Sequence, residues 1–465
     1  MPQAQTVDLP KRLPLVIEPE NRDSSVAKDA RLVNCYSEKT PEGDYWIFKR
    51  PGTATSSRPY GGAAAGRGMF NWLGNIYSVF EDTLYKDGVS LGAVNTTNGV
   101  YRFSSNKGAT PKLQLGNGVK AYNYDDSNGL VEIIDVDFPA AFVKGWSYLD
   151  ATTYVGTAAA AIQGSGINNT VDWDPLNVII AQIEPDRGVA LAKQLVYTVM
   201  FKEWSTEIFY DAGNATGSPL GAVQGAKLNY GCKSADSVVS VDGILIWVCV
   251  NQSTSVQVMM MEGLKAEIIS TDPVERILGA ATYTTVHAYF FKQVHRFYVL
   301  TITASNITLV YDLDEKRWHQ WTDSSGNYFP MVATTYDSSL NLYFQHETDG
   351  YIYTASPTLY TDNGSIITAD IYTPNFDGGT KRRKQLNMMN FVGDQVAGST
   401  LQVRVNDYDY DAKKWSNFRK VDLSVPNAQL GNCGTFVRRA HNLRHQAATA
   451  FRLRAVELQM DLGTL

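Results

Sequence analysis

The sequence predicts an all-β protein with a β-propeller-like main body, an additional small β module and few short helices, and three observations support this fold class. The 465 residues include 26 Tyr and 11% aromatic residues, which are more common in strands than in helices. Short apolar runs alternate with Gly or Asx-Gly turns, a pattern typical of β-hairpins. These hairpin units recur about every 40–55 residues, the length of one four-stranded propeller blade. An array of β-sandwiches is the alternative fold.

The first predicted unit, residues 1–57, is an N-terminal arm followed by a hairpin. Residues 1–30 are polar and contain four prolines, so we expect an extended arm with one short strand at residues 15–17. Two apolar runs, at residues 31–36 and 45–50, flank a turn that contains Pro and Gly. This arrangement predicts a hairpin that leads into the main body.

The main body, residues 58–375, consists of repeated short hairpins. One short helix is expected at residues 270–278, because Asp272 can cap it and Pro273 suits its first turn. The sequence does not show how many blades the body contains. The turns that support the repeat most clearly are the Asp-Gly pairs at residues 87–88, 242–243 and 349–350.

The third unit, residues 376–465, is a basic β module. The whole chain has a net charge of −6, but residues 381–454 carry a local charge of +9 and the remainder carries −15. We interpret the basic residues as a surface that docks on an acidic protein, rather than on DNA phosphates, because the chain as a whole is acidic. The residues of this candidate assembly interface are Lys381, Arg382, Arg383, Arg438, Arg439, Arg444, Arg452 and Arg454.

The sequence contains no pattern typical of catalysis, cofactor binding or metal binding. Its four cysteines lack a CxxC spacing and are expected to be free thiols. His441 and His445 lie among arginines, which disfavour a bound cation, and the glycine-rich residues 61–68 lack the Lys and Ser/Thr of a phosphate loop. We therefore predict a non-enzymatic protein with no catalytic residue, cofactor or metal. Neither a signal peptide nor a membrane span is expected.

Three phrases of the sequence, taken in order, resemble a known family. The first begins with Lys49–Thr53 and continues at residues 67–68, 75–79 and 83–88, and the third is the Arg-rich ending at residues 438–439 and 451–454. The second and most specific phrase is residues 203–213, followed by residues 231–234 and 242–247, and within it the resemblance rests on Trp204, Ser205, Glu207 and Phe209. Together the phrases resemble the tail hub, or nozzle, proteins of short-tailed bacteriophages (podoviruses), also called packaged-DNA stabilisation proteins.

This resemblance implies a structural virion protein of the phage tail that is made in the cytoplasm of the host bacterium. It implies a homo-oligomeric ring, usually a hexamer, which extends the DNA channel below the portal and adaptor complex and retains packaged DNA. The implied partners are the head-to-tail adaptor protein, a tail fibre, spike or needle protein, and double-stranded DNA in transient, non-specific passage.

A carbohydrate-binding or glycoside-hydrolase tail protein built on a β-propeller is the alternative function. Aromatic side chains stack on sugars, and a glycoside hydrolase needs two carboxyl groups at a defined separation. We interpret the acidic residues nevertheless as solvated turn residues. The acids that lie close together in the sequence are Glu132, Asp135 and Asp137, and Asp172 and Asp174.

Overall fold

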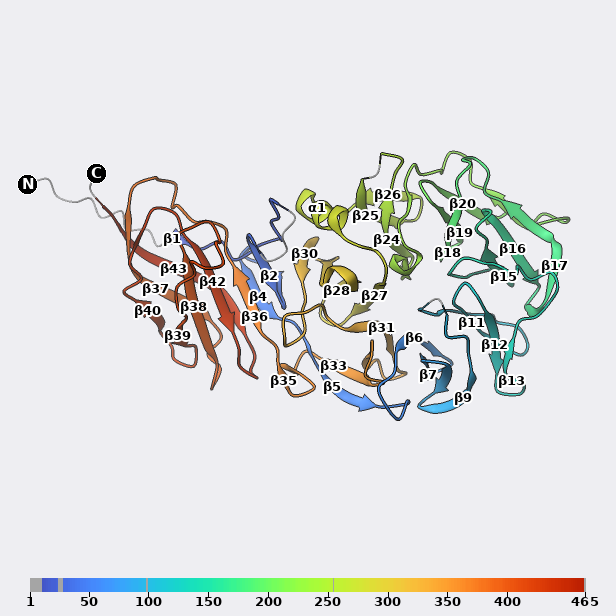
Figure 1. Cartoon of the computed structure of the whole chain (residues 1–465), viewed down its shortest axis with the longest axis horizontal. Helices are drawn as coiled ribbons and strands as arrows, with labels where there is room; N and C mark the ends of the chain where they lie inside the picture. The colour runs from blue at the N-terminus through green and yellow to red at the C-terminus, as the bar shows by residue number, and fades with distance from the viewer. Residues whose placement is uncertain (1–10, 24–27, 98, 254, 464–465) are drawn as a thin grey trace, which may run out of the picture.

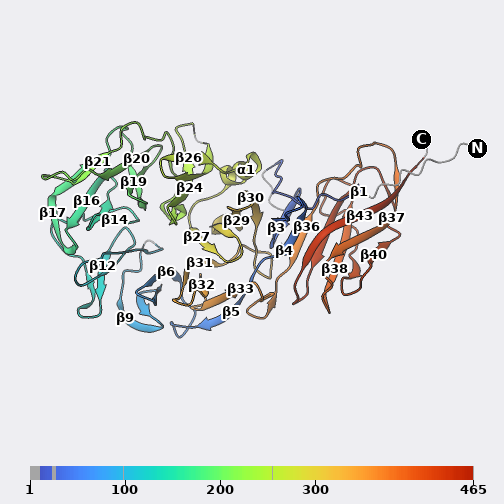
Figure 2. The ribbon, with the colours of Figure 1, turned by 180° about the vertical axis from the view of Figure 1, so that it is seen from behind.

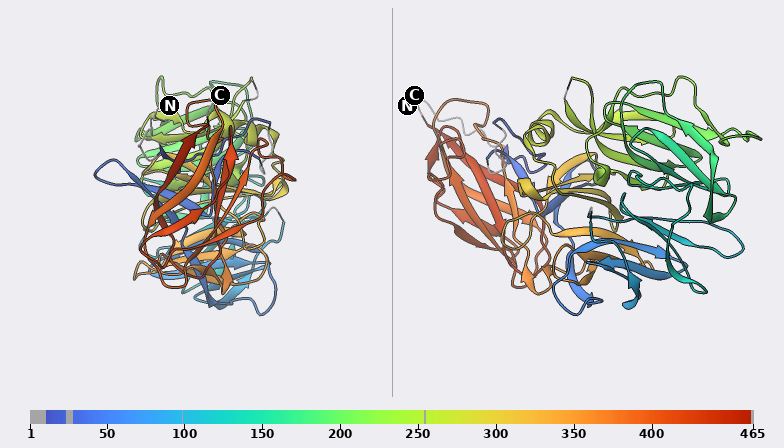
Figure 3. Two further views of the ribbon diagram at one scale, coloured as in Figure 1. Left: turned by 90° about the vertical axis from the view of Figure 1, so that its left-hand side faces the viewer. Right: turned by 45° about the vertical axis from the view of Figure 1, so that its right-hand side comes forward.

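The computed structural model describes residues 11–23, 28–97, 99–253 and 255–463. Its strands form a ring of β-sheets and a smaller β module, which lie at opposite ends of the long axis (Figure 1). The view from behind shows the same separation (Figure 2). Strands from both ends of the chain build the module, whereas the middle of the chain builds the ring (Figure 3).

The ring is a β-propeller of seven blades, which confirms the predicted fold class. The innermost strands of neighbouring blades, β6, β10, β14, β18, β23, β27 and β31, are in contact, and the last blade contacts the first, so the ring is closed. In chain order the blades are β6–β9 (Gly66–Trp72, Asn75–Phe80, Thr83–Lys86, Val89–Ala93), β10–β13 (Arg102–Ser105, Leu113–Gly116, Ala121–Asp125, Gly129–Glu132), β14–β17 (Ser147–Leu149, Thr152–Gly156, Ala161–Gly166, Asn169–Ile180), β18–β21 (Gly188–Gln194, Tyr197–Lys202, Thr206–Asp211, Leu220–Ala222), β22–β26 (Gly231–Cys232, Val239–Val241, Ile244–Val250, Val256–Glu262, Lys265–Ile268), β27–β30 (Val286–Lys292, Arg296–Ile302, Ile307–Asp312, Arg317–Gln320), and β31–β33 with β5 (Met331–Tyr336, Leu342–His346, Ile352–Ser356, Gly52–Ser57).

Two of the three predicted Asp-Gly turns form tight hairpins in this structure, whereas at residues 349–350 only Gly350 has a positive φ, of 76°. At Asp87 and Gly88, φ is 48° and 83°, so both residues adopt the left-handed conformation that a tight two-residue hairpin turn requires. Asp242 and Gly243 do the same, with φ of 47° and 79°. The innermost strand of each blade begins 36 to 51 residues after that of the preceding blade.

Strand β5 closes the ring. It precedes the first blade in the sequence, yet it pairs antiparallel with β33 of the last blade, with Thr53 opposite Ala355. The short strands β34 (Thr361–Asp362) and β35 (Ser365–Ile366) extend the same sheet. The closed propeller therefore depends on pairing between distant parts of the chain.

The module consists of two sheets that share one hydrophobic core. Leu32, Ile371 and Leu443 enter this core from one sheet, and Met389 and Val456 enter it from the other. The first sheet continues from β30 of the propeller and contains β2 (Arg31–Val33), β36 (Ala369–Tyr372), β42 (Ala440–His445), β38 (Thr400–Asn406) and β39 (Arg419–Asp422). The second contains β3 (Cys35–Lys39), β4 (Tyr45–Lys49), β43 (Arg452–Leu462), β37 (Lys384–Gly393) and β40 (Ala428–Gly431), with β1 (Lys11–Arg12) and β41 (Thr435–Phe436) at its margins.

The N-terminal segment differs in part from the prediction. The hairpin forms between β3 and β4, but residues 31–33 leave it at Asn34, whose φ is 55°, and pair in the other sheet as β2. Residues 15–17 do not form a strand, so that prediction was wrong. They run extended, and the alternating side chains Leu13, Leu15 and Ile17 enter the core of the module.

The predicted helix is present as α1 (Asp272–Ala280), but its cap is one residue earlier than expected. Thr271, not Asp272, is the N-cap residue, and Pro273 lies in the first turn as predicted. In the part of the chain that the structure describes, no helix is long and apolar enough to cross a membrane. Two 3₁₀ turns, η1 (Ala235–Ser237) and η2 (Thr303–Ser305), are the other helical segments there.

Candidate functional site

The centre of the propeller contains a cavity of about 570 Å³ that all seven blades line. Its wall is formed by residues on or next to the inner strands β6, β10, β14, β18, β23, β27 and β31. Among the residues that line it, four are basic and none is acidic, and the basic ones are Arg102, Lys107, Lys144 and Lys193. We call this space the propeller cavity.

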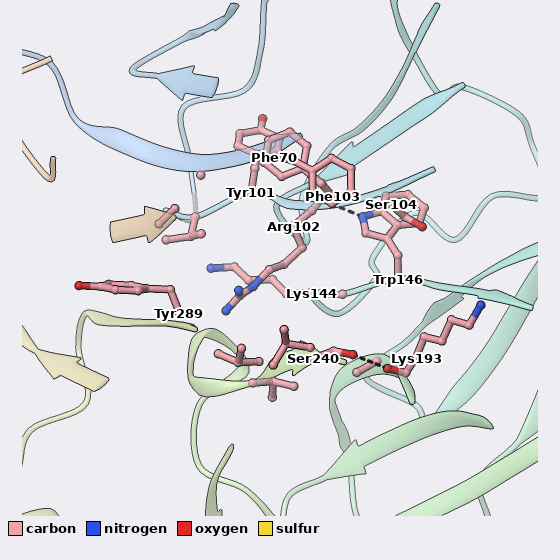
Figure 4. A pocket seen from close by; sticks show the side chains of 18 of the residues that line it. Phe70, Tyr101, Arg102, Phe103, Ser104, Lys144, Trp146, Lys193, Ser240 and Tyr289 are labelled. Carbon is pink, nitrogen blue, oxygen red and sulfur yellow. Dashed lines mark hydrogen bonds between the residues drawn. The ribbon is translucent and has the colours of Figure 1, made fainter. Parts of the chain in front are cut away.

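Arg102 and Lys144 lie side by side on one side of the propeller cavity (Figure 4). The Nζ of Lys144 lies 2.7 Å from Oδ2 of Asp236, and Nη2 of Arg102 donates to the backbone oxygen of Asp236 at 2.8 Å. Burial lowers the pKa of Lys144 below its ordinary value, although the Asp236 carboxylate acts in the opposite direction. One carboxylate thus contacts two cations and neutralises only one of their charges.

Lys107 and Lys193 form a second pair of cations, on either side of Tyr148. The Nζ of Lys193 lies 5.7 Å from the centre of the Tyr148 ring, and the backbone N–H of Lys107 donates to the Tyr148 hydroxyl at 3.2 Å. Burial, and after it the charge of Lys107, lowers the pKa of Lys193. Neither lysine forms an ion pair within the described part of the chain.

Aromatic rings form much of the remaining wall. Phe70 and Phe103 stack with their ring centres 5.7 Å apart, and the indole N–H of Trp146 donates to the backbone oxygen of Arg102 at 3.0 Å. Figure 4 shows these rings close to Arg102 and Lys144, whereas the side chain of Lys193 extends away from those two cations. The propeller cavity therefore combines positive charge with apolar surface, and no carboxyl group is found among the described residues that line it.

Among the acidic residues considered for glycoside hydrolysis, Asp135 and Asp174 accept hydrogen bonds from backbone N–H groups two residues further along the chain. Asp135 accepts the backbone N–H of Asp137 at 2.9 Å, and Asp174 accepts that of Leu176 at 2.9 Å. Glu132 forms an ion pair with Lys120. Among the described residues, no group of three or more His, Cys, Asp or Glu side chains is arranged to hold a metal ion.

The second family phrase builds a buried ionic cluster in the fourth blade. Lys202 lies between two carboxylates, with its Nζ 2.6 Å from Oε1 of Glu207 and 3.0 Å from Oδ1 of Asp186. Ser205 donates to Asp186 from its hydroxyl at 2.8 Å and from its backbone N–H at 2.9 Å, and the backbone N–H of Trp204 donates to the same carboxylate at 2.9 Å. Burial acts to raise the pKa of Asp186, but these hydrogen bonds and Lys202 hold it below its ordinary value.

This cluster ties the loop before β18 to the hairpin of β19 and β20. Glu207 also accepts the backbone N–H of Ile183 at 3.0 Å, and Lys202 donates to the backbone oxygen of Glu184 at 2.8 Å. Phe209 lies two residues further along β20 in the core shared by the third and fourth blades. The residues that carry the resemblance thus contribute to the packing and the buried ion pairs of the fourth blade. Sequence reasoning missed Asp186, because this residue of the cluster lies outside the phrase.

The predicted basic interface is largely neutralised by carboxylates of the same chain. Arg382 donates to the backbone oxygen of Gly463 at 2.6 Å, while Lys381 and Arg383 are exposed and form no ion pair among the described residues. The remaining five arginines each pair with an acid: Arg438 with Asp409, Arg439 with Asp407, Arg444 with Asp370, Arg452 with Asp394 and Arg454 with Asp44.

The end of the molecule opposite the module carries acidic and apolar side chains. Residues 145–186, which include the third blade, contain five acidic and no basic residues. The outermost strand of this blade, β17, lies at the far end of the propeller from the module (Figure 1). Exposed apolar side chains lie on β17 and beside it, with Leu176 72% exposed, and they are Ile167, Val171, Leu176, Val178, Ile180 and Ile183. We call this surface the distal edge.

Comparison with solved structures gives matches of low sequence identity. Streptogramin B lyase matches at 9% identity and a TM-score of 0.39, over 67% of this chain and 97% of that chain. A virginiamycin B lyase from Staphylococcus aureus matches at 8% identity and a TM-score of 0.40, over 63% of this chain and 94% of that chain. U3-55K matches at 9% identity and a TM-score of 0.40, over 65% of this chain and 97% of that chain.

A search of curated proteins found no match. The family model described as bacteriophage P22 Gp10, β-propeller, matches residues 38–340. This range spans more than half of the chain and includes the second family phrase with its buried ionic cluster. It confirms the resemblance to the packaged-DNA stabilisation proteins, and the chain belongs to the family of the bacteriophage P22 Gp10 β-propeller.

Proposed function

We propose that this chain forms a ring in the tail of a short-tailed phage, where it extends the DNA channel below the portal and adaptor complex. The ring retains packaged DNA and anchors tail fibres, a spike or a needle, and it acts as a structural part and not as an enzyme. The family match over residues 38–340 carries this proposal. DNA passes without tight binding, because the chain has a net charge of −6.

The two ends of the molecule support head-to-tail contacts between copies. The distal edge carries exposed apolar side chains beside the exposed acids Asp172 and Asp174, whereas the module exposes basic side chains that form no ion pair among the described residues. Contacts between unlike ends of identical subunits generate closed rings when the rotation between neighbours closes. The exposed basic residues of the module that form no ion pair among the described residues include Lys381, Arg383, Lys413, Lys414 and Lys420.

Assembly of the purified chain on its adaptor ring tests the proposal. We expect electron microscopy to show a ring of copies, usually six, bound coaxially to the adaptor. A chain that stays monomeric in the presence of its adaptor ring would overturn the proposed function.

Two matched double variants test where the copies touch. Leu176→Ser/Ile180→Ser removes apolar surface from β17 and should reduce ring formation. Leu73→Ser/Val89→Ser removes apolar side chains of similar exposure from the first blade and should leave ring formation unchanged. Equal ring formation by both variants would contradict a contact through the distal edge. The proposal that the chain forms a ring would be tested separately by the assembly experiment.

The carbohydrate-binding or hydrolytic alternative rests on the aromatic wall of the propeller cavity. It predicts turnover or retention of host polysaccharide by the isolated chain. Because no acidic residue lines the cavity, a hydrolase would need to place its carboxyl pair elsewhere. Polysaccharide turnover that disappears when one carboxyl pair is neutralised would favour this alternative over the structural role.

A further inference from the structure

We propose that the propeller cavity binds a small anion with a phosphate or carboxylate group, held by Lys107 and Lys193. Four basic and no acidic side chains line this cavity, within a chain whose overall charge is negative. The inference is independent of ring formation and of the family, because it rests on the lining of one cavity within one chain.

The charges around the cavity are not balanced by the protein. Asp236 lies behind the wall and pairs with Lys144 at 2.7 Å, and the nearest contact of its carboxylate with Arg102 is 3.8 Å. Lys107 and Lys193 have no such partner among the described residues. An anion beside Lys107 and Lys193 would interact favourably with both cations, and the partial burial of Lys193 strengthens its interaction relative to water.

The position of the two lysines suits a shared ligand. Tyr148 lies between them, since Lys193 covers its ring and Lys107 binds its hydroxyl through the backbone. Tyr148 thus contacts the backbone of one lysine and the side chain of the other, and neither ammonium group has an acceptor among the described residues. Lysine ammonium groups bind phosphate and carboxylate as point charges with rotatable donors.

The space and the remaining wall also suit a small ligand. About 570 Å³ falls within the range of small-molecule sites in proteins. The Nε and Nη1 of Arg102 donate to no described residue, so further donors are available beside Lys144 (Figure 4). Phe70, Phe103 and Trp146 supply apolar surface for the uncharged part of the ligand.

Calorimetric titration of the full chain tests the proposal with defined probes. Inorganic phosphate, glucose 6-phosphate and glucuronate are titrated at constant ionic strength, and glucose serves as the neutral control. We expect saturable binding of one anion per chain and no binding of glucose. Preference for glucose 6-phosphate or glucuronate distinguishes a phosphorylated from a carboxylated ligand, and either result supports the site.

Variants then assign the binding to the two lysines. Lys193→Met and Lys107→Met should each weaken binding by about 10- to 100-fold, the effect of losing one charge-assisted hydrogen bond. Lys265→Met, at an exposed lysine on the outer strand β26, should bind like the wild type. An unchanged melting temperature of Lys193→Met would show that the loss is not due to unfolding.

Three outcomes would overturn the proposal. One is the absence of saturable binding for every anion at millimolar concentration. Another is binding that Lys107→Met and Lys193→Met leave unchanged, or that Lys265→Met weakens equally. The third is equal binding of glucose, which would point to recognition of the sugar ring by the aromatic wall.

Discussion

The buried ammonium group of Lys202 allows a direct test of what holds the fourth blade together. Its side chain is fully buried and donates to Glu207 at 2.6 Å and to the backbone oxygen of Glu184 at 2.8 Å, and its Nζ lies 3.0 Å from Asp186. Methionine has a similar volume, so Lys202→Met keeps the packing but removes the charge. Two carboxylates then remain buried without a cation, which should lower the free energy of unfolding by about 3–5 kcal/mol.

This loss is large enough to measure by scanning calorimetry. The entropy of unfolding is about 2.1 cal/mol/K per residue, or roughly 1 kcal/mol/K if the whole chain unfolds as one unit. The melting temperature of Lys202→Met should therefore fall by about 3–5 °C, and by more if the propeller unfolds alone. Denaturant titration followed by circular dichroism gives the free energy independently.

Lys227→Met provides the matched control in the same blade. Lys227 forms an ion pair with Glu184, but the two side chains are 25% and 31% exposed, so its loss should cost less than about 1 kcal/mol. Adding Glu207→Leu to Lys202→Met should restore part of the stability, because it removes one of the unpaired charges. Equal stability of Lys202→Met and Lys227→Met would refute the view that the cluster is a buried ionic clasp.

Two further predictions concern acid sensitivity and the closure of the ring. Burial holds the pKa of His319 at about 4 and those of His441 and His445 at about 3, whereas a histidine in the unfolded chain has a pKa of about 6.5. The unfolded chain therefore binds more protons below pH 6.5, so the free energy of unfolding is highest above that pH and decreases as the pH falls. Denaturation at pH 8 and pH 5 should show a loss of up to about 2 kcal/mol per histidine, with a smaller loss in His441→Gln, and a flat profile would contradict these burials. A fragment of residues 58–375 should be less stable than one of residues 50–366, because only the latter contains β5 to complete the last blade. Equal protease resistance of the two fragments would show that β5 is dispensable.

The blades could be predicted because each is encoded locally. Turns such as Asp87-Gly88 require left-handed backbone, and Asp and Gly adopt it at low cost, so each hairpin is marked within about ten residues. Repetition of that signal at blade length then indicates the ring. The residue ranges of the three units stay predictions, although the pairing of β2, β3 and β4 with C-terminal strands places residues 31–49 in the module.

The charged sites could not be predicted, because their partners are distant in the sequence. Arg454 pairs with Asp44, and Arg444 pairs with Asp370, so a count of charges between residues 381 and 454 overstates the positive charge of the surface. The residues of the propeller cavity are likewise distant from one another in the sequence. Arg102, Lys144 and Lys193 come from three different blades, and nothing in their local sequence indicates that they share one wall.

Buried ion pairs lie in or beside the first two phrases that carry the resemblance, and they hold parts of the fold together. Arg50 of the first phrase is fully buried and forms an ion pair with Asp362, and it also binds Oδ1 of Asn34 at 2.9 Å and the backbone oxygen of Thr322 at 3.0 Å. It thereby joins the module to the last two blades, just as Lys202 joins the strands of the fourth. Because both residues point inward, a chain can keep these phrases while its exposed surfaces change. Family membership therefore predicts the shape of this protein, whereas its contacts must be tested at the distal edge and in the propeller cavity.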